Sequence, residues 1–398
     1  MSIPDDGAAR REFATGWPTV LGAAAAIGVG SMGIGFYSMG LLMNPVQAEF
    51  GWSRAQASGA VTFQQLGIFL SAPVVGLLAD RFGMRWIAVC SYAAAALALV
   101  LLSRAGPSVS AWYAMWLLVS LAGCGTAPAI WARLVSSRFN SARGLALGLM
   151  LLGTGFAAML TPALLGPVII EHGWRTAVLA MAATTALVGI PVSLLVREDR
   201  QKTPEAAAAR GRFEWNRQTG VLLVVGALLG FIVAGLVVHL VPMLLDRGVE
   251  AASAARVAMV VGIAVIAARV IVGYLFDRFH APYVAALFLV APTLASLILW
   301  QGGPPVIAAV FLGLAVGAEV DMLAYFTSRY ARMENYGATY GGILGVFCLG
   351  AAFGPLAFGR SVDLTGDYAL ALAASAAVLA AVVVLIARLG PYRYPRSA

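Results

Sequence analysis

Three ionisable residues interrupt long apolar segments of this 398-residue chain and are the first candidates for chemistry. Arg269 stands in one such segment, and Glu319 and Asp321 stand two residues apart in another. If these segments cross a membrane, each charge costs at least ~2.5–3.5 kcal/mol there, so its default interpretation is functional. An arginine keeps its charge and its planar guanidinium matches a carboxylate. We therefore predict that Arg269 binds an anion; the alternative is a permanent ion pair with an acid.

The two acids cannot both face one cavity, because two residues correspond to about 200° around a helix. A buried carboxylate near Arg269 is a candidate proton carrier. Glu319 and Asp321 are therefore the candidates for proton coupling, and Tyr325 shares the helix face of Asp321. His239 lies in a further apolar run and is followed by Pro242. It is a candidate for binding, gating or proton sensing, or equally a histidine that is satisfied inside a helix interface.

Sequence signatures of enzymes are absent, which argues against catalysis. There is no HExxH, no GxSxG and no Walker A loop, and the sole lysine, Lys202, has no glycine-rich approach. The three histidines are too scattered for a metal cluster, and the three cysteines are too far apart for a CxxC site. We expect no cofactor, no metal and no enzymatic activity.

The composition of the chain indicates which kind of secondary structure positions these residues. The chain is 61% hydrophobic and 11% charged, whereas a soluble domain carries roughly 25% charged residues. So few charges cannot cover a water-exposed surface, and the apolar runs do not alternate as barrel strands do. The sequence therefore predicts an all-α integral membrane protein. The formal charge of +8 reflects arginines in short loops between apolar runs, which indicates membrane topology and not nucleic-acid binding.

Breaking the apolar runs at charges, Gly and Pro predicts twelve transmembrane helices. Nineteen of the 26 basic residues then fall on the side of both termini and six on the other, with Arg269 inside the membrane. The positive-inside rule places both termini in the cytoplasm, which suggests a bacterial inner membrane. The predicted spans are 18–42, 56–79, 86–104, 111–133, 144–168, 175–196, 218–245, 253–276, 283–301, 305–329, 339–360 and 367–388.

An internal repeat divides the chain into two six-helix bundles. Gly-Leu-Leu-Ala-Asp-Arg-Phe-Gly at 76–83 matches Gly-Tyr-Leu-Phe-Asp-Arg-Phe-His at 273–280, and Ser-Arg-Phe at 137–139 matches Ser-Arg-Tyr at 328–330. Parallel repeats of this kind surround a midplane site. The predicted parts are a cytoplasmic tail at 1–17, bundles at 18–196 and 218–388, a cytoplasmic linker at 197–217 and a tail at 389–398.

The stretch 76–85, Gly-x-x-x-Asp-Arg-Phe-Gly-Met-Arg, resembles the signature loop of the major facilitator superfamily. In that family the loop's Asp and Arg lock the cytoplasmic side of the two bundles. The resemblance assigns a cytoplasmic gate to both copies of the loop, although His280 replaces the family's Gly in the second. The implied gate residues are Asp80, Arg81, Arg85, Asp277 and Arg278.

Within that superfamily, three stretches are similar to the oxalate/formate antiporter and monocarboxylate transporter group. They are Tyr-Ser-Met-Gly-Leu-Leu-Met-Asn-Pro-Val at 37–46 with Glu-Phe-Gly-Trp-Ser-Arg at 49–54, Arg-Gly-Leu-Ala-Leu-Gly at 143–148, and Ala-Arg at 268–269. The resemblance implies that Arg269 binds the substrate anion. It adds Tyr37 and Gln65 as polar cavity positions, with simple interhelical hydrogen bonds as the alternative, and it favours Glu319 over Asp321 on the substrate path.

The chain departs from both family patterns. Ile343 stands where the antiporter pattern has a lysine, Asn44 where the monocarboxylate pattern has one, and Val265 where that pattern has an aspartate. One cavity cation argues against a small dianion. We therefore expect a monomeric transporter that moves a small organic anion, a monocarboxylate, by proton-coupled symport. Organic-anion exchange is the alternative, and a transporter-like membrane sensor is a more distant one. The candidate substrate-binding residues are Arg269, Tyr37, Gln65, Glu319, Tyr325 and His239.

Overall fold

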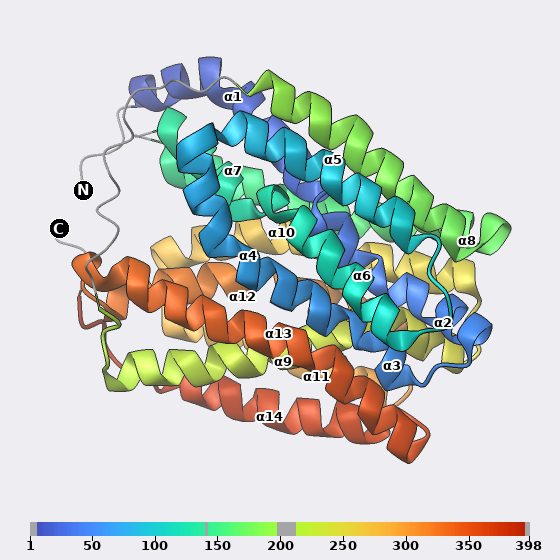
Figure 1. Cartoon of the computed structure of the whole chain (residues 1–398). Helices are drawn as coiled ribbons and strands as arrows, with labels where there is room; N and C mark the ends of the chain where they lie inside the picture. The colour runs from blue at the N-terminus through green and yellow to red at the C-terminus, as the bar shows by residue number, and fades with distance from the viewer. Residues whose placement is uncertain (1–5, 140–141, 197–211, 395–398) are drawn as a thin grey trace. The chain divides into compact units, whose positions relative to one another are not determined.

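The computed structural model describes residues 6–139, 142–196 and 212–394 (Figure 1). The side chains of a few helical residues, Asp80 and Asp277 among them, lie outside this description. Every regular element in the described ranges is helical, and nine of these helices are long and apolar enough to cross a membrane. The prediction of an all-α membrane protein is confirmed.

The chain divides into two compact units. The first contains residues 1–51 and 63–203, and the second contains residues 52–62 and 204–398. Residues 52–62 therefore pack with the second unit although they connect two helices of the first. Of the predicted linker at 197–217, residues 197–211 lie outside the described ranges.

The first unit is built around one long element. This helix, α8, contains two predicted spans and changes direction at Gly173, whose φ of +80° lies in the region that favours glycine. Both α1 and α5 pack along α8. The elements are α1 (Asp6–Gly28), η1 (Ser31–Gly35), α2 (Met39–Phe50), α4 (Ala60–Phe82), α5 (Met84–Leu102), α6 (Val109–Ala122), η2 (Cys124–Thr126), α7 (Pro128–Arg138) and α8 (Arg143–Leu195).

Two predicted spans of this unit, 18–42 and 111–133, are interrupted in the structure. The first is broken by the π-turn η1, where Gly33 leaves helical geometry, and the other by η2. The Ser31 amide donates to Thr126 Oγ1 at 3.1 Å, and Gln64 Nε2 donates to the Ser31 carbonyl at 3.1 Å. Non-helical backbone at membrane depth needs such partners, and the break at η1 finds them in Thr126 of η2 and Gln64 of α4.

The second unit consists of paired helices: α9 packs along α13, α10 along α12, and α11 along α14. In Figure 1, α9, α13 and α14 lie side by side. The elements are α3 (Arg54–Ser58), α9 (Arg217–Asp246), α10 (Ala251–Arg278), α11 (Ala281–Trp300), α12 (Pro305–Tyr330), η3 (Met333–Asn335), α13 (Tyr336–Thr365) and α14 (Ala369–Ala387).

The helices account for all twelve predicted spans. The pieces α1 and α2 form one span, α6 and α7 form another, and α8 contains two. The remaining spans correspond to α4, α5 and α9 to α14. Most of their ends lie within a few residues of the predicted limits; α13 extends past both limits, whereas α14 lies inside them.

Candidate functional site

The site forms where α10 and α12 approach each other closely. A Cβ atom added at Gly317 would lie 2.6 Å from the Ala268 Cβ, and one added at Gly313 would lie 2.3 Å from the Val261 carbonyl oxygen. Small residues of this kind let two membrane helices approach with their backbones nearly in contact. The close approach brings the face of α12 that carries Asp321 next to Arg269.

Arg269 and Asp321 form an ion pair across this contact. Nη1 of Arg269 lies 3.3 Å from both carboxylate oxygens of Asp321. The Arg269 side chain is 11% exposed and that of Asp321 is 34% exposed, so the acid is the more accessible partner. Both bonds use one guanidinium nitrogen, whereas the strongest arginine–carboxylate contacts use two in parallel. A substrate carboxylate that offered the two-nitrogen geometry would therefore be a competitive partner for Arg269.

Glu319 lies on the same helix in a different environment. The residue is 7% exposed, and its Oε2 atom accepts no hydrogen bond from any described residue. The acid that contacts the guanidinium is thus Asp321. The preference for Glu319 on the substrate path stays a prediction.

Two residues of α13 that the sequence analysis missed belong to this neighbourhood. Tyr340 lies within the electrostatic influence of both Asp321 and Arg269, and Cys348 within that of Glu319. The Tyr340 ring stacks on that of Tyr336, with centroids 5.7 Å apart and an interplanar angle of 12°. The spacing of four residues between the two tyrosines was the available signal, because it places both on one helix face.

Two other candidates of the second unit have partners of their own. The Tyr325 hydroxyl donates to the Phe276 carbonyl at 3.1 Å and accepts from Arg329 Nη2 at 3.0 Å. His239 is fully buried, with Nδ1 3.0 Å from the Tyr368 hydroxyl and Nε2 2.8 Å from the Pro355 carbonyl. A carbonyl only accepts, so Nε2 must donate and the neutral ring must accept from Tyr368 at Nδ1.

The candidates Tyr37 and Gln65 belong to the first unit. Tyr37 follows the break between α1 and α2, and its ring meets that of Phe36 edge-on at 5.3 Å. Gln65 in α4 is 6% exposed, and its Oε1 atom has no hydrogen-bond donor among the described residues. A buried amide oxygen of this kind is a site at which a ligand or a water could donate a hydrogen bond.

The arginines of the predicted gate lie against aromatic rings at helix ends. Arg81 lies 5.3 Å from the Phe82 ring, Arg85 5.5 Å from the Trp86 ring, and Arg278 4.7 Å from the Tyr274 ring. Gly83, which precedes α5, has a φ of +84°, a conformation that favours glycine. The side chains of Asp80 and Asp277 lie outside the described part of the structure.

A polar network that the sequence did not indicate joins α3 to the ends of α9 and α13. Asp363 accepts hydrogen bonds from the backbone amides of Arg54 at 2.8 Å and Ala55 at 3.0 Å, so it caps the start of α3. Nη2 of Arg54 lies 2.8 and 2.7 Å from the two carboxylate oxygens of Asp246. This network ties residues 52–62 into the second unit.

The long apolar helices, with two interrupted spans and an ion pair between α10 and α12, indicate a multi-pass membrane protein. The Major Facilitator Superfamily matches residues 25–355, so the chain belongs to this family. Among solved structures, that of nucleoside transporter NupG is similar, with a TM-score of 0.73, 12% identity, and coverage of 95% of this chain and 99% of that one. An inward-facing, occupied bacterial homolog of the human lysosomal transporter Spinster has a TM-score of 0.66, 18% identity and 94% coverage of both chains. At these identities the likeness shows the fold alone.

Relatives found by sequence indicate which members of the family this chain is similar to. Monocarboxylate transporter 11 of Homo sapiens is 28% identical over 380 residues, which cover 89% of this chain and 79% of that protein. Its Mus musculus counterpart is 29% identical over 386 residues, covering 89% and 83%. An uncharacterized 38 kDa protein of Thermoproteus tenax is 29% identical over 361 residues, covering 89% and 91%. The chain is thus related to monocarboxylate transporters, as its sequence motifs indicated.

Proposed function

We propose that this protein is a proton-coupled transporter that moves a small monocarboxylate by alternating access. The observation that carries the proposal is the Arg269–Asp321 ion pair between two membrane helices. A guanidinium at that depth is costly unless it is paired, and a substrate carboxylate is the natural second partner. The relationship to proteins named monocarboxylate transporter 11 supports the same substrate class.

Competition for Arg269 provides the coupling in this proposal. While Asp321 is ionised it occupies Nη1 of the guanidinium, and a substrate anion must displace it. A proton taken up by Asp321 removes its charge, so Asp321 then competes less strongly with the substrate carboxylate for the arginine. Binding of one substrate carboxylate and one proton is therefore cooperative, and by linkage each strengthens the other.

Glu319 serves as a second proton position in this scheme. It lies two residues from Asp321 and is buried, and its Oε2 atom has no hydrogen-bond donor among the described residues. With Asp321 also protonated, a proton held there leaves the site with no net charge while a substrate carboxylate is bound to Arg269.

The proposal is tested by uptake of radiolabelled lactate, pyruvate and acetate into proteoliposomes with and without an inward proton gradient. Wild-type protein should accumulate at least one of them only with the gradient, and uridine should serve as the neutral comparison. Arg269→Lys should abolish most uptake, because an ammonium lacks the planar fork. Arg256→Lys is the matched control, since Arg256 lies on the same helix, is exposed and donates to Ser253.

The outcome also separates the alternatives. If uptake does not depend on the proton gradient but requires an anion inside the vesicles, the protein is an organic-anion exchanger and not a proton symporter. Wild-type uptake by the Arg269→Lys variant would contradict an anion site at this arginine. Binding of a monocarboxylate without any flux would favour a transporter-like sensor.

A further inference from the structure

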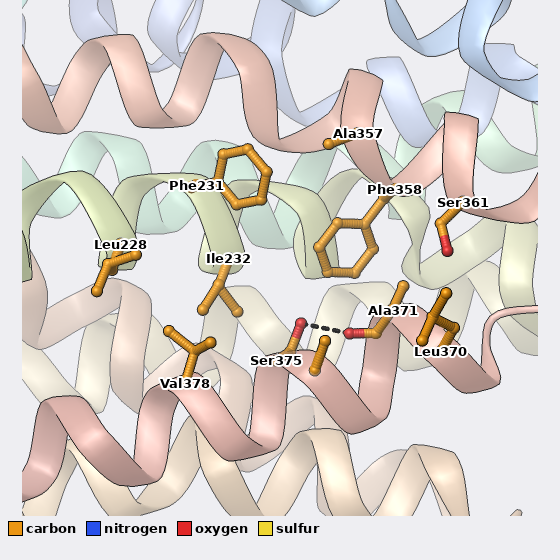
Figure 2. Close-up of a pocket in the computed structure, with 11 residues that line it drawn as sticks. Leu228, Phe231, Ile232, Ala357, Phe358, Ser361, Leu370, Ala371, Ser375 and Val378 are labelled. Atoms are coloured by element: carbon orange, nitrogen blue, oxygen red, sulfur yellow. Dashed lines mark hydrogen bonds between the residues drawn. The ribbon is translucent and has the colours of Figure 1, made fainter.

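A cavity of about 250 Å³ lies inside the second unit between α9, α13 and α14, away from the Arg269 site. Figure 2 shows its walls, with the Phe231 and Phe358 rings on one side and the small residues of α14 on the other. The lining is apolar except for two serines. Its residues are Leu228, Phe231, Ile232, Ala357, Phe358, Ser361, Leu370, Ala371, Ala374, Ser375 and Val378.

The cavity borders the surface that faces the bilayer. Leu370 at one end is 58% exposed, and Ala374 one turn further along α14 is also exposed. All three helices are membrane spans, so the medium at this opening is lipid. From Leu370 to Val378 the cavity follows α14 for about 12 Å at ~1.5 Å per residue. That length approaches one leaflet of a hydrocarbon core about 30 Å thick.

The two serines differ in their hydrogen bonding. Ser375 Oγ donates to the Ala371 carbonyl of its own helix at 2.7 Å. Ser361 Oγ is buried and has no hydrogen-bond partner among the described residues, and Figure 2 shows it directed from α13 toward α14. Ser361 lies one turn before the end of α13 at Thr365, which is the depth where a hydrocarbon core meets the polar interface. The Ser361 hydroxyl therefore has no hydrogen-bond acceptor among the described residues, and a bound ligand could supply one.

We propose that this cavity binds one acyl chain of a membrane phospholipid, whose ester carbonyl accepts a hydrogen bond from Ser361. The acyl chain supplies the apolar contacts that the cavity walls lack. Water is a poor occupant of a cavity with so few polar groups. The ester carbonyls of a leaflet lie at its hydrocarbon boundary, which is where Ser361 stands. The length of the cavity and the position of its single unpaired hydroxyl, among the residues the structure describes, thus fit the same molecule.

The test uses the full chain in proteoliposomes that contain a phospholipid with a photoreactive diazirine on one acyl chain. After irradiation, peptides are mapped by mass spectrometry, and lipid retained after detergent washing is identified by native mass spectrometry. Ala374→Phe fills the opening from an exposed position. Ala380→Phe is the matched control, because Ala380 is exposed on the same helix and does not line the cavity.

Wild-type protein and Ala380→Phe should retain a phospholipid and show labelling concentrated at 228–232, 357–361 and 370–378. Ala374→Phe should reduce that labelling to the level of other lipid-facing peptides and lose the retained lipid. Ser361→Ala should keep the labelled positions but release the lipid sooner on washing. Equal labelling in both phenylalanine variants, or recovery of a free fatty acid or no lipid from the wild type, would overturn the proposal.

Discussion

Replacing Asp321 by Asn should tighten substrate binding, which is the opposite of what a purely structural ion pair predicts. Two unit charges 3.3 Å apart attract by about 5 kcal/mol at an effective dielectric constant of about 20. Asp321 is one-third exposed, so solvent screening reduces the net value well below this figure. In the wild type, a substrate carboxylate contacts Arg269 only if the Arg269–Asp321 pair breaks. Much of the attraction that the substrate gains is therefore offset by the attraction lost with that pair.

The Asp321→Asn substitution would keep the size of the side chain and remove the competing charge. If about 1.4–2.7 kcal/mol of the attraction is recovered, monocarboxylate affinity at neutral pH rises roughly 10- to 100-fold. Protonation of Asp321 in the wild type has the same effect, so wild-type binding should strengthen as the pH falls. The variant should bind equally well across that range and should fail to accumulate substrate in response to a proton gradient.

Affinity is measured by thermal shift with increasing lactate, pyruvate or acetate at two pH values, because a ligand stabilises by RT ln(1 + [L]/Kd). Glu319→Gln serves as the comparison, since it neutralises the neighbouring acid without freeing the guanidinium. A loss of about 3–5 kcal/mol of stability in Asp321→Asn, without tighter binding, is what a buried structural pair would give. That result would refute the competition argument and leave Arg269 with a structural role.

Three further predictions concern the second unit. Asp363→Ala should remove the hydrogen bonds from the Arg54 and Ala55 amides at the start of α3 and leave its Ser53 capping box in place. We expect a loss of about 1 kcal/mol of stability, seen as a decrease of roughly 2–4 °C in the melting temperature, with monocarboxylate binding at Arg269 unchanged. An unchanged melting temperature would contradict this role of Asp363. Burial raises the pKa of Glu214, but hydrogen bonds from the Arg332 amide and the Tyr394 hydroxyl outweigh it and leave the pKa below its usual value. Wild type should therefore be more stable than Glu214→Gln above the usual carboxyl pKa, and melting curves should converge as the pH falls through the lowered one. Gly313→Leu should separate α10 from α12 and reduce both stability and monocarboxylate binding, whereas exposed Gly273→Leu on α10 should do neither.

Hydropathy was sufficient to predict the helical fold, because a bilayer requires every spanning backbone group to be paired within its own helix. It missed the breaks at η1 and η2, since the residues there remain apolar or small. What stabilises each break is a partner far away in sequence, as with Ser31 and Thr126. Such pairs depend on which helices meet, and an apolar pattern carries no information about that.

The network around α3 shows the same limit for charged residues. Arg54 and Asp246 are ordinary charges near span ends in the sequence, and Asp363 follows the predicted span 339–360. Only the packing of residues 52–62 against the second unit brings them together. Counting charges by side of the membrane predicts topology but not which of these charges make contact.

The identity of the acid that meets Arg269 depends on a rotation that the sequence leaves undetermined. Glu319 and Asp321 have nearly the same depth, and a turn of α12 about its axis by less than the 200° between them would exchange their environments. The close contact of Gly317 with Ala268 and the Val265 carbonyl fixes that rotation, because only one face of α12 lacks side chains. With that face against α10, Asp321 reaches the guanidinium and Glu319 is buried, with no hydrogen bond to its Oε2 from the described residues. The glycine thus decides which carboxylate competes for the arginine, and a side chain at 317 should disturb the ion pair as much as a change in either charge.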